Sequence, residues 1–436
     1  MGRSKIGPTA DPFLAAVAAA EVSQQRAERK RGLEALPVYE KAVAQFEAAL
    51  KLAPHPPNLA AIEASINLGE CLQNWGETTL SAASTLPDDV LTCEVEAEAQ
   101  TRACALFRRA VHAYGAAVPC DQPSTSAAAT PCAAPSTSAA PRADVAVNCA
   151  NTLASWAEAA VEGQEGPRQL LAQALHLYRA ALSSEPDALT WGNLADAEVA
   201  TAVAAAGGGD GAAAEACAER ARAAYATACQ LSSTDNGDDL PGLLANWGTG
   251  LVALAGLMQD SATKLATLEE AVQRLRESAS FDRADPAPLC ALGDAFVAAA
   301  EAGADGPATL RALRSALEDG YGAALRVDAR HAEARAGAGD ARMALARALA
   351  AGGDEAGGQG ALCGAEADYG AALARPERLG GWRERADVRY NLACCLARQG
   401  RAEEARQLLG ALIASGAVAE ATAREDADLA GLWQQA

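Results

Sequence analysis

Apolar side chains in this chain recur with the period of a helix rather than that of a strand. The segment from Tyr390 to Leu409 shows this most clearly. Its apolar or small residues fall on one helical face in each of two stretches, Leu392, Ala393 and Leu396 in the first and Ala405, Leu408, Leu409 and Leu412 in the second. Between the stretches, Gly400 can adopt the left-handed conformation that ends a helix. The segment therefore predicts two short helices joined by a tight turn.

Both halves of this hairpin pattern recur along the chain. The second half is an Ala, an aromatic residue four positions later and an Ala three positions further, a spacing that places all three on one helical face. Its clearest copies are centred on Phe46, Tyr178 and Tyr369, and its weaker copies on Phe107, Tyr225, Leu275 and Tyr321. The first half is an Asn followed by an apolar and then a small residue, and it begins at Asn67, Asn193, Asn246, Asn391 and, more loosely, Asn148.

These alternating elements resemble the tetratricopeptide repeat over roughly residues 11–415. The resemblance implies an all-α fold, an α-solenoid with a right-handed superhelix of about eight helical hairpins. We place the hairpins at 11–54, 58–118, 145–185, 188–231, 240–281, 287–328, 332–375 and 382–415, with a last, capping helix at 422–433. The repeats are longer than the usual unit of about 34 residues. We expect the additional residues to expand the turns inside the hairpins, at the Gly-rich stretches 207–211, 303–307 and 352–360.

Residues 119–143 interrupt the hairpin pattern. The sequence PCDQPSTSAA is nearly repeated there as PCAAPSTSAA, and a segment so rich in Ser, Thr, Ala and Pro cannot form a core. We expect a disordered linker that divides N-terminal hairpins (1–118) from a C-terminal array with its capping helix (144–436). A neutral insertion and a phosphorylated tether are both compatible with this composition.

The composition agrees with closely packed helices. Half of the residues are hydrophobic but only 4% are aromatic, and alanine is abundant. No segment approaches the roughly 20 apolar residues of a membrane span, so we expect no membrane insertion. The net charge of −20 argues against binding to nucleic acid or to anionic membranes. We expect a cytoplasmic protein, with the nucleus or an organelle interior as alternatives; the sequence leaves the oligomeric state open.

The sequence contains no motif typical of an enzyme or a metal site. Its 12 cysteines include no Cys-x-x-Cys and are accompanied by only 4 histidines, so no metal or cofactor is predicted. It has no phosphate-binding loop, nucleophile elbow or His-Glu-x-x-His motif. The adjacent Cys394 and Cys395 point about 100° apart on a helix and are not expected to form a disulfide; Cys395 is expected to pack in the core. We therefore expect a protein without enzymatic activity.

Candidate binding residues lie on the first helix of each hairpin. In a solenoid these helices line the concave groove, and the Asn and the residue three positions later both point into it. An amide can both donate and accept a hydrogen bond, and the resemblance implies that this Asn contacts the backbone of a bound peptide. The predicted groove residues are Asn67, Glu70, Asn148, Asn151, Asn193, Asp196, Asn246, Asp294, Asp340 and Asn391.

The charge of these residues indicates the kind of ligand. Acids occupy the second groove position at Glu70, Asp196, Asp294 and Asp340, and no base occurs at that position. The Lys- and Arg-lined groove with which related domains hold acidic chaperone tails is therefore not present. We expect an adaptor or scaffold that binds an extended, basic polypeptide segment. The alternatives are a structural subunit of a larger assembly and, less compatible with the charge, a helical-repeat RNA-binding protein.

Overall fold

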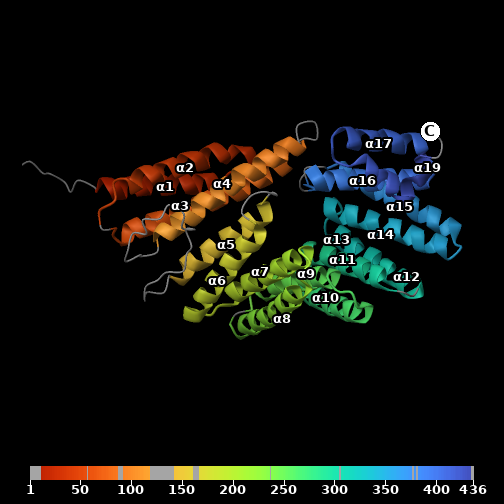
Figure 1. Cartoon of the computed structure of the whole chain (residues 1–436), viewed down its shortest axis with the longest axis horizontal. Coiled ribbons are helices and arrows are strands. Elements are labelled where there is room, and N and C mark those ends of the chain that lie inside the picture. The colour runs from red at the N-terminus through yellow and green to blue at the C-terminus, as the bar shows by residue number, and fades with distance from the viewer. Residues whose placement is uncertain are drawn as a thin grey trace, which may run out of the picture. The chain divides into compact units, whose positions relative to one another are not determined.

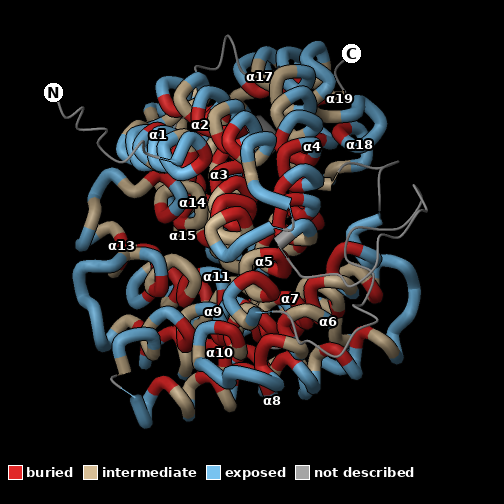
Figure 2. Tube along the Cα trace, turned by 90° about the vertical axis from the view of Figure 1, so that its left-hand side faces the viewer, coloured by how far each residue is buried: buried red, intermediate tan, exposed pale blue. Residues whose placement is uncertain are grey.

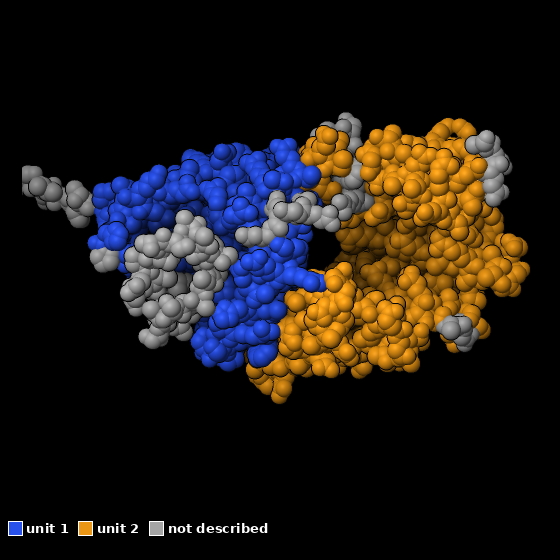
Figure 3. Space-filling model, viewed as in Figure 1, with its two compact units in different colours: residues 1–83, 97–197 blue, residues 84–96, 198–436 orange. Residues whose placement is uncertain are grey.

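The computed structural model describes most of the chain, namely residues 11–55, 57–86, 92–117, 142–160, 166–235, 237–303, 306–375, 378–379 and 382–433. Within these ranges all regular secondary structure is helical (Figure 1). The chain divides into two compact units, residues 1–83 with 97–197 and residues 84–96 with 198–436 (Figure 3). The linker predicted at 119–143 lies almost wholly outside the described residues, so the domain division expected there stays a prediction.

The first unit contains three helical hairpins. They are formed by α1 (Pro12–Glu28) with α2 (Leu36–Leu50), α3 (Leu59–Ser84) with α4 (Cys93–Ala117), and α5 (Ala143–Ala159) with α6 (Pro167–Ser184). However, Ser84 at the end of α3 and residues 93–96 at the start of α4 belong to the second unit. The short helix η1 (Gly32–Glu34) joins the first pair. The first half of α7 (Ala188–Gly207) completes the unit, and the division between the units falls within this helix.

The second unit continues the same pattern to the end of the chain. Its helices are the second half of α7, α8 (Gly211–Thr234), α9 (Leu240–Gly256), α10 (Ser261–Phe281), α11 (Ala287–Ala302), α12 (Gly306–Ser315), the π-helical turn η2 (Ala316–Gly320), α13 (Tyr321–Val327), α14 (Ala332–Ala351), α15 (Glu355–Leu373), α16 (Trp382–Arg398) and α17 (Ala402–Ala414). The prediction of an all-α solenoid built from helical hairpins is confirmed. At Gly400 the backbone has a φ of +78°, as expected for the residue that ends α16.

The additional residues of the longer repeats lie in the helices rather than in the turns. The helix α14 continues to Ala351 and α15 begins at Glu355, where the side chain of Asp354 accepts a hydrogen bond from the backbone N–H of Gly357. Likewise α7 continues to Gly207, and α8 begins at Gly211 after the N-cap Asp210. The prediction of expanded turns at these stretches was wrong. Alanine-rich flanks extend the first helix, and an Asp N-cap starts the second one directly.

The two helices of a hairpin meet where a large ring packs on a residue with little or no side chain. The rings of Tyr321 and Tyr369 are buried. Figure 2 shows that buried and exposed residues alternate along the helices, as expected for helices with one buried face. A Cβ added at Gly293 would lie 2.6 Å from the ring of Tyr321, and one added at Gly339 would lie 2.5 Å from the ring of Tyr369. The ring of Tyr321 also contacts Gly337 in the following hairpin, so a single side chain joins two hairpins.

The equivalent ring in the second hairpin is Tyr114. Its ring packs on Gly69, the small residue of the first-helix pattern, whereas Phe107 packs on Gly76 further along α3. The sequence alignment centred on Phe107 was therefore wrong by two helical turns. Because α3 and α4 are 26 and 25 residues long, they offer two successive positions at which a ring meets a glycine.

The C-terminal cap predicted as one helix at 422–433 is a broken segment. It consists of α18 (Glu420–Glu425), the 3-10 helix η4 (Ala427–Leu429) and α19 (Ala430–Trp433). Trp433 packs against the core cluster of the last hairpins, as expected for a residue that covers the end of the array. Its indole N–H donates a hydrogen bond to the carbonyl of Ala423, and the guanidinium of Arg424 lies over its ring.

Replacing Gly339 with Ala tests the contact between ring and glycine. The added methyl group would collide with Tyr369, so we expect Gly339→Ala to lower the free energy of unfolding by about 1–3 kcal/mol. The matched control is Gly370→Ala on the facing helix α15, where an added Cβ meets no atom within 4 Å. That variant should be neutral or gain up to about 1 kcal/mol from helix propensity. Urea denaturation of the two variants checks this, and equal midpoints would contradict it.

Candidate functional site

The first helices of successive hairpins pack side by side, and we call the surface that they form within each unit the first-helix face. In the first unit, three Asn side chains of this face each donate an N–H to the preceding first helix. The contacts are Asn67 to Glu21 at 3.1 Å, Asn148 to Glu70 at 3.0 Å and Asn193 to Asn151 at 3.2 Å. These contacts form a regular ladder of hydrogen bonds between hairpins, which the sequence analysis did not predict.

The same contact recurs in the second unit. There Asn391 on α16 donates its side-chain N–H to Asp340 on α14, at 2.8 Å. The acceptor in each of these pairs is the residue just after the small packing residue. The ladder therefore fixes the register between one first helix and the next.

A tyrosine hydroxyl from the second helix of the same hairpin reaches the same acceptor position. The contacts are Tyr178 to Asn151 at 2.7 Å, Tyr321 to Asp294 at 2.5 Å and Tyr369 to Asp340 at 2.7 Å. The sequence analysis placed these tyrosines on one face of the second helices and did not predict the contacts of their hydroxyl groups. The recurrence of Tyr rather than Phe at this position was the signal, because a buried phenol requires a hydrogen-bond partner.

The ladder determines which polar atoms remain available to a ligand. Both Asp294 and Asp340 are exposed, and both accept their hydrogen bonds on the oxygen Oδ1, Asp294 from Tyr321 and Asp340 from Tyr369 and Asn391. Among the described residues, no donor contacts the second oxygen, Oδ2, of either carboxylate. Each Asn that donates in the ladder uses an N–H internally and keeps its carbonyl oxygen, whereas Asn151 uses its carbonyl oxygen as an acceptor. The face consequently presents hydrogen-bond acceptors more than donors.

The carboxyl groups of this face are poorly stabilised in their charged form. Surrounding protein atoms desolvate Asp294 and Asp340 and raise the pKa of each. The charge of Asp340 raises the pKa of Asp294 further, while the tyrosine hydroxyls act in the opposite direction. Burial also raises the pKa of Glu70 in the first unit.

The structure places all ten predicted residues on first helices. Eight of them take part in the contacts described above, namely Asn67, Glu70, Asn148, Asn151, Asn193, Asp294, Asp340 and Asn391. Asp196 on α7 is half-buried and Asn246 on α9 is exposed, at the equivalent positions of their helices. The ladder gives these residue types a structural role. Their contact with a ligand stays a prediction.

A second polar cluster joins the C-terminal cap to the last hairpin. The side chains of Cys394, Asp426 and Asp428 are close enough to one another to surround a metal ion. However, Asp428 is paired with Arg347 and Arg398, and Asp426 accepts a hydrogen bond from Tyr390 at 2.7 Å.

This cluster holds the C-terminal cap on the last hairpin, and its contacts do not favour metal binding. The arginines already compensate the charge of Asp428, and burial raises the pKa of the Cys394 thiol, which disfavours the thiolate that a metal would require. Cys395 is fully buried and donates to the carbonyl of Leu362, so the prediction that it packs in the core is confirmed.

Comparisons with known proteins return helical-repeat folds at low similarity. The nuclear import adaptor Nro1 of S. pombe is 12% identical with a TM-score of 0.40, over 72% of this chain and 94% of Nro1. The signal transduction ATPase PH0952 of Pyrococcus horikoshii, which has a tetratricopeptide repeat sensor, is 12% identical with a TM-score of 0.40, over 93% of this chain and 50% of that one. Yeast Tom70 is 13% identical with a TM-score of 0.23, over 97% and 99% of the two chains. Similarities this low carry no conclusion about partners.

No protein-family model matches the sequence, and no curated protein matches it. Among the described residues, no helix combines the length and the apolar character that crossing a lipid bilayer requires.

The raised pKa of Asp340 predicts how its charge affects stability. The folded chain holds the proton of the Asp340 carboxyl group more tightly than the unfolded chain does. Protonation of Asp340 therefore stabilises the folded chain at low pH, and this stabilisation is lost as the pH rises through the pKa of the folded state. In Asp340→Asn, the amide oxygen can still accept from Tyr369 and Asn391 without a charge. We expect this variant to be at least as stable as the parent at pH 7, with its advantage disappearing toward pH 4.

Thermal unfolding across this pH range measures the effect. Tyr369→Phe serves as the comparison, because it removes one ladder hydrogen bond and should lower the free energy of unfolding by about 1 kcal/mol. If Asp340→Asn lost as much stability at pH 7 as Tyr369→Phe, the desolvation of Asp340 would not be the dominant effect.

Proposed function

We propose that this chain is a non-catalytic adaptor whose first-helix face binds an extended, basic polypeptide segment. The observation that carries the proposal is the pair of exposed, desolvated carboxyl groups at Asp294 and Asp340. A Lys or Arg of a partner would donate to the oxygens that the ladder leaves without a donor. It would also supply the stabilisation that these carboxylates lack in the free protein.

The arrangement of the acids supports a peptide as the ligand. Asp294 and Asp340 lie on the neighbouring first helices α11 and α14, which pack against each other. Helices in such contact have axes about 8–10 Å apart, so a ligand that reaches both acids must extend across the helices. An extended chain with spaced basic residues has this reach. The net charge of −20 disfavours nucleic acid as the ligand.

The resemblance to tetratricopeptide repeats supports the same proposal, since repeat arrays of this class present their first helices as an extended binding surface. The excess of hydrogen-bond acceptors on the first-helix face adds a preference for a basic segment. In this proposal the amide oxygens of the ladder contact backbone N–H groups, and the acids select the side chains.

Neutralising the two acids tests the proposal. We expect Asp294→Asn with Asp340→Asn to reduce recovery of co-purified partner protein from the native cell by about tenfold at low salt, with a smaller effect at 0.5 M salt, where charges are screened. The matched control is Glu215→Gln with Glu219→Gln, which removes two exposed charges from the second helix α8. Unchanged recovery at every salt concentration, or an equal loss with the control, would overturn the electrostatic mechanism.

The pH dependence of binding provides an independent check. Because the pKa values of Asp294 and Asp340 are raised, these groups lose their charge on acidification before ordinary aspartates do. We expect affinity for a fluorescein-labelled peptide of alternating Arg and Ala, measured by fluorescence polarisation, to fall as the pH drops from 7 toward 5. The Asn double variant should bind weakly with a flat profile. A parent profile without this fall would contradict the assignment of these two acids as the contacts.

A further inference from the structure

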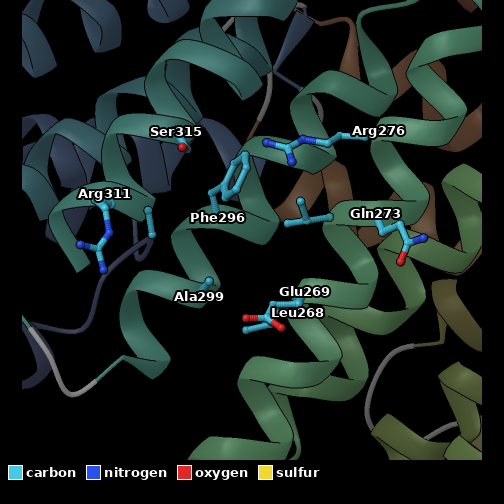
Figure 4. Close-up of a pocket in the computed structure, with 10 residues that line it drawn as sticks. Leu268, Glu269, Gln273, Arg276, Phe296, Ala299, Arg311 and Ser315 are labelled. Carbon is cyan, nitrogen blue, oxygen red and sulfur yellow. The ribbon is translucent and has the colours of Figure 1, made fainter. Parts of the chain in front are cut away.

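An open pocket of about 530 Å³ lies in the second unit, among α10, α11 and α12 (Figure 4). Phe296 of α11 lies in its centre and is half-buried. Its other apolar lining residues are Leu268, Val272, Ala299 and Ala312. Helices α10 and α12 are second helices of their hairpins, so this pocket involves elements outside the first-helix face.

The pocket lies next to the irregularity in the second helix of the sixth hairpin. Ser315, the last residue of α12, lines it, and the π-helical turn η2 begins at the next residue. A Cβ added at Gly322 would lie 2.2 Å from the carbonyl oxygen of Leu317, so this turn requires a glycine there. Turns of this kind interrupt the regular stacking of a helix and occur frequently at functional sites.

Two arginines border this apolar pocket. Arg276 reaches from α10 toward Phe296, and its guanidinium carbon lies 5.5 Å from the ring centroid (Figure 4). Its ion pair with Asp319 spans 3.5 Å between two exposed groups, an arrangement that contributes little. Arg311, on the facing helix α12, forms no ion pair with any residue that the structure describes.

The combination of charge and apolar surface indicates the ligand. One guanidinium group over an aromatic ring and a second one in the pocket lining, in a chain with a net charge of −20, favour an anionic group attached to an apolar one. The single acid in the lining, Glu269, lies on α10 and can accept a hydrogen bond from a backbone N–H. Because the pocket is open on one side, it suits a side chain of a docked peptide better than a small molecule, which pockets usually enclose.

We propose that this pocket is a second docking site, which binds a peptide segment carrying a bulky apolar residue flanked by acidic residues. The apolar side chain packs on Phe296, and the flanking carboxylates pair with Arg276 and Arg311. The site selects the opposite charge from the first-helix face. It therefore recognises a different segment from the basic one, either on the same partner or on another.

Fluorescence polarisation with three fluorescein-labelled peptides tests this proposal on the full chain. The probe has the core Asp-Leu-Phe-Glu; one comparison peptide has Lys in place of both acids, and the other has Ser in place of Leu and Phe. We expect the acidic, apolar peptide to bind at least tenfold more tightly than either comparison peptide. Equal binding of the first two peptides would overturn the role of the arginines, and absence of binding up to 1 mM would overturn the site.

Variants of α12 provide a matched pair. Arg311→Glu should weaken binding of the acidic, apolar peptide by at least tenfold, whereas Arg314→Glu, an exposed arginine on the same helix that does not line the pocket, should change it less than twofold. Both variants change the net charge equally, and circular dichroism confirms that each is folded. Equal losses would show a general charge effect and overturn the site.

Two further variants complete the design. Phe296→Ala should abolish the preference for Leu-Phe over Ser, and an unaltered preference would overturn the role of that ring. Glu215→Gln with Glu219→Gln on α8 should leave binding of the acidic, apolar peptide unchanged, since these exposed acids do not line the pocket. A loss with this double variant equal to that with Arg311→Glu would overturn the second site.

Discussion

The contact on which the hairpins depend is the packing of a tyrosine ring against a residue that lacks a side chain. The rings of Tyr321 and Tyr369 lie directly on Gly293 and Gly339. Because no Cβ is in the way, each ring extends past the first helix, and its hydroxyl emerges beside the next residue along that helix. The apolar packing thereby determines where the polar acceptor of the ladder must be. At these two positions an added Cβ would collide with the ring and disturb both contacts.

The ladder carries this local contact from hairpin to hairpin. At Asp340 a single oxygen accepts from Tyr369 of its own hairpin and from Asn391 of the next, so packing within a repeat and register between repeats depend on one atom. Where the Asn position holds Gly337, the ring of Tyr321 occupies the space itself. Either arrangement joins neighbouring hairpins, which explains why the Asn pattern can lapse without loss of the repeat.

The sequence was sufficient to predict the eight hairpins, since helical periodicity and the position of small residues follow directly from close helix packing. Phe107 was misaligned because α3 and α4 are long enough to hold two ring–glycine contacts, and only their spatial pairing identifies Tyr114 as the equivalent. The candidate acids were located correctly on first helices, but their bonds to tyrosine hydroxyls depend on ring orientation, which periodicity does not contain. The pocket near Phe296 lies next to a π-helical turn, for which the sequence offers only the glycine at 322.

At Asp294 and Asp340, the hydrogen bonds that stabilise the fold and the proposed contact with a ligand use different oxygen atoms. The hydroxyl and amide donors occupy Oδ1 of these groups, so a cationic ligand at Oδ2 would add a contact without displacing an existing one. The negative charge of each carboxylate is unfavourable in the free protein, because burial desolvates it. A basic ligand would stabilise that charge and would also form a hydrogen bond of its own. Asparagine preserves Oδ1 and removes only the charge, whereas alanine would remove both. A loss of binding on replacement with asparagine can therefore be assigned to electrostatics rather than to a disrupted repeat.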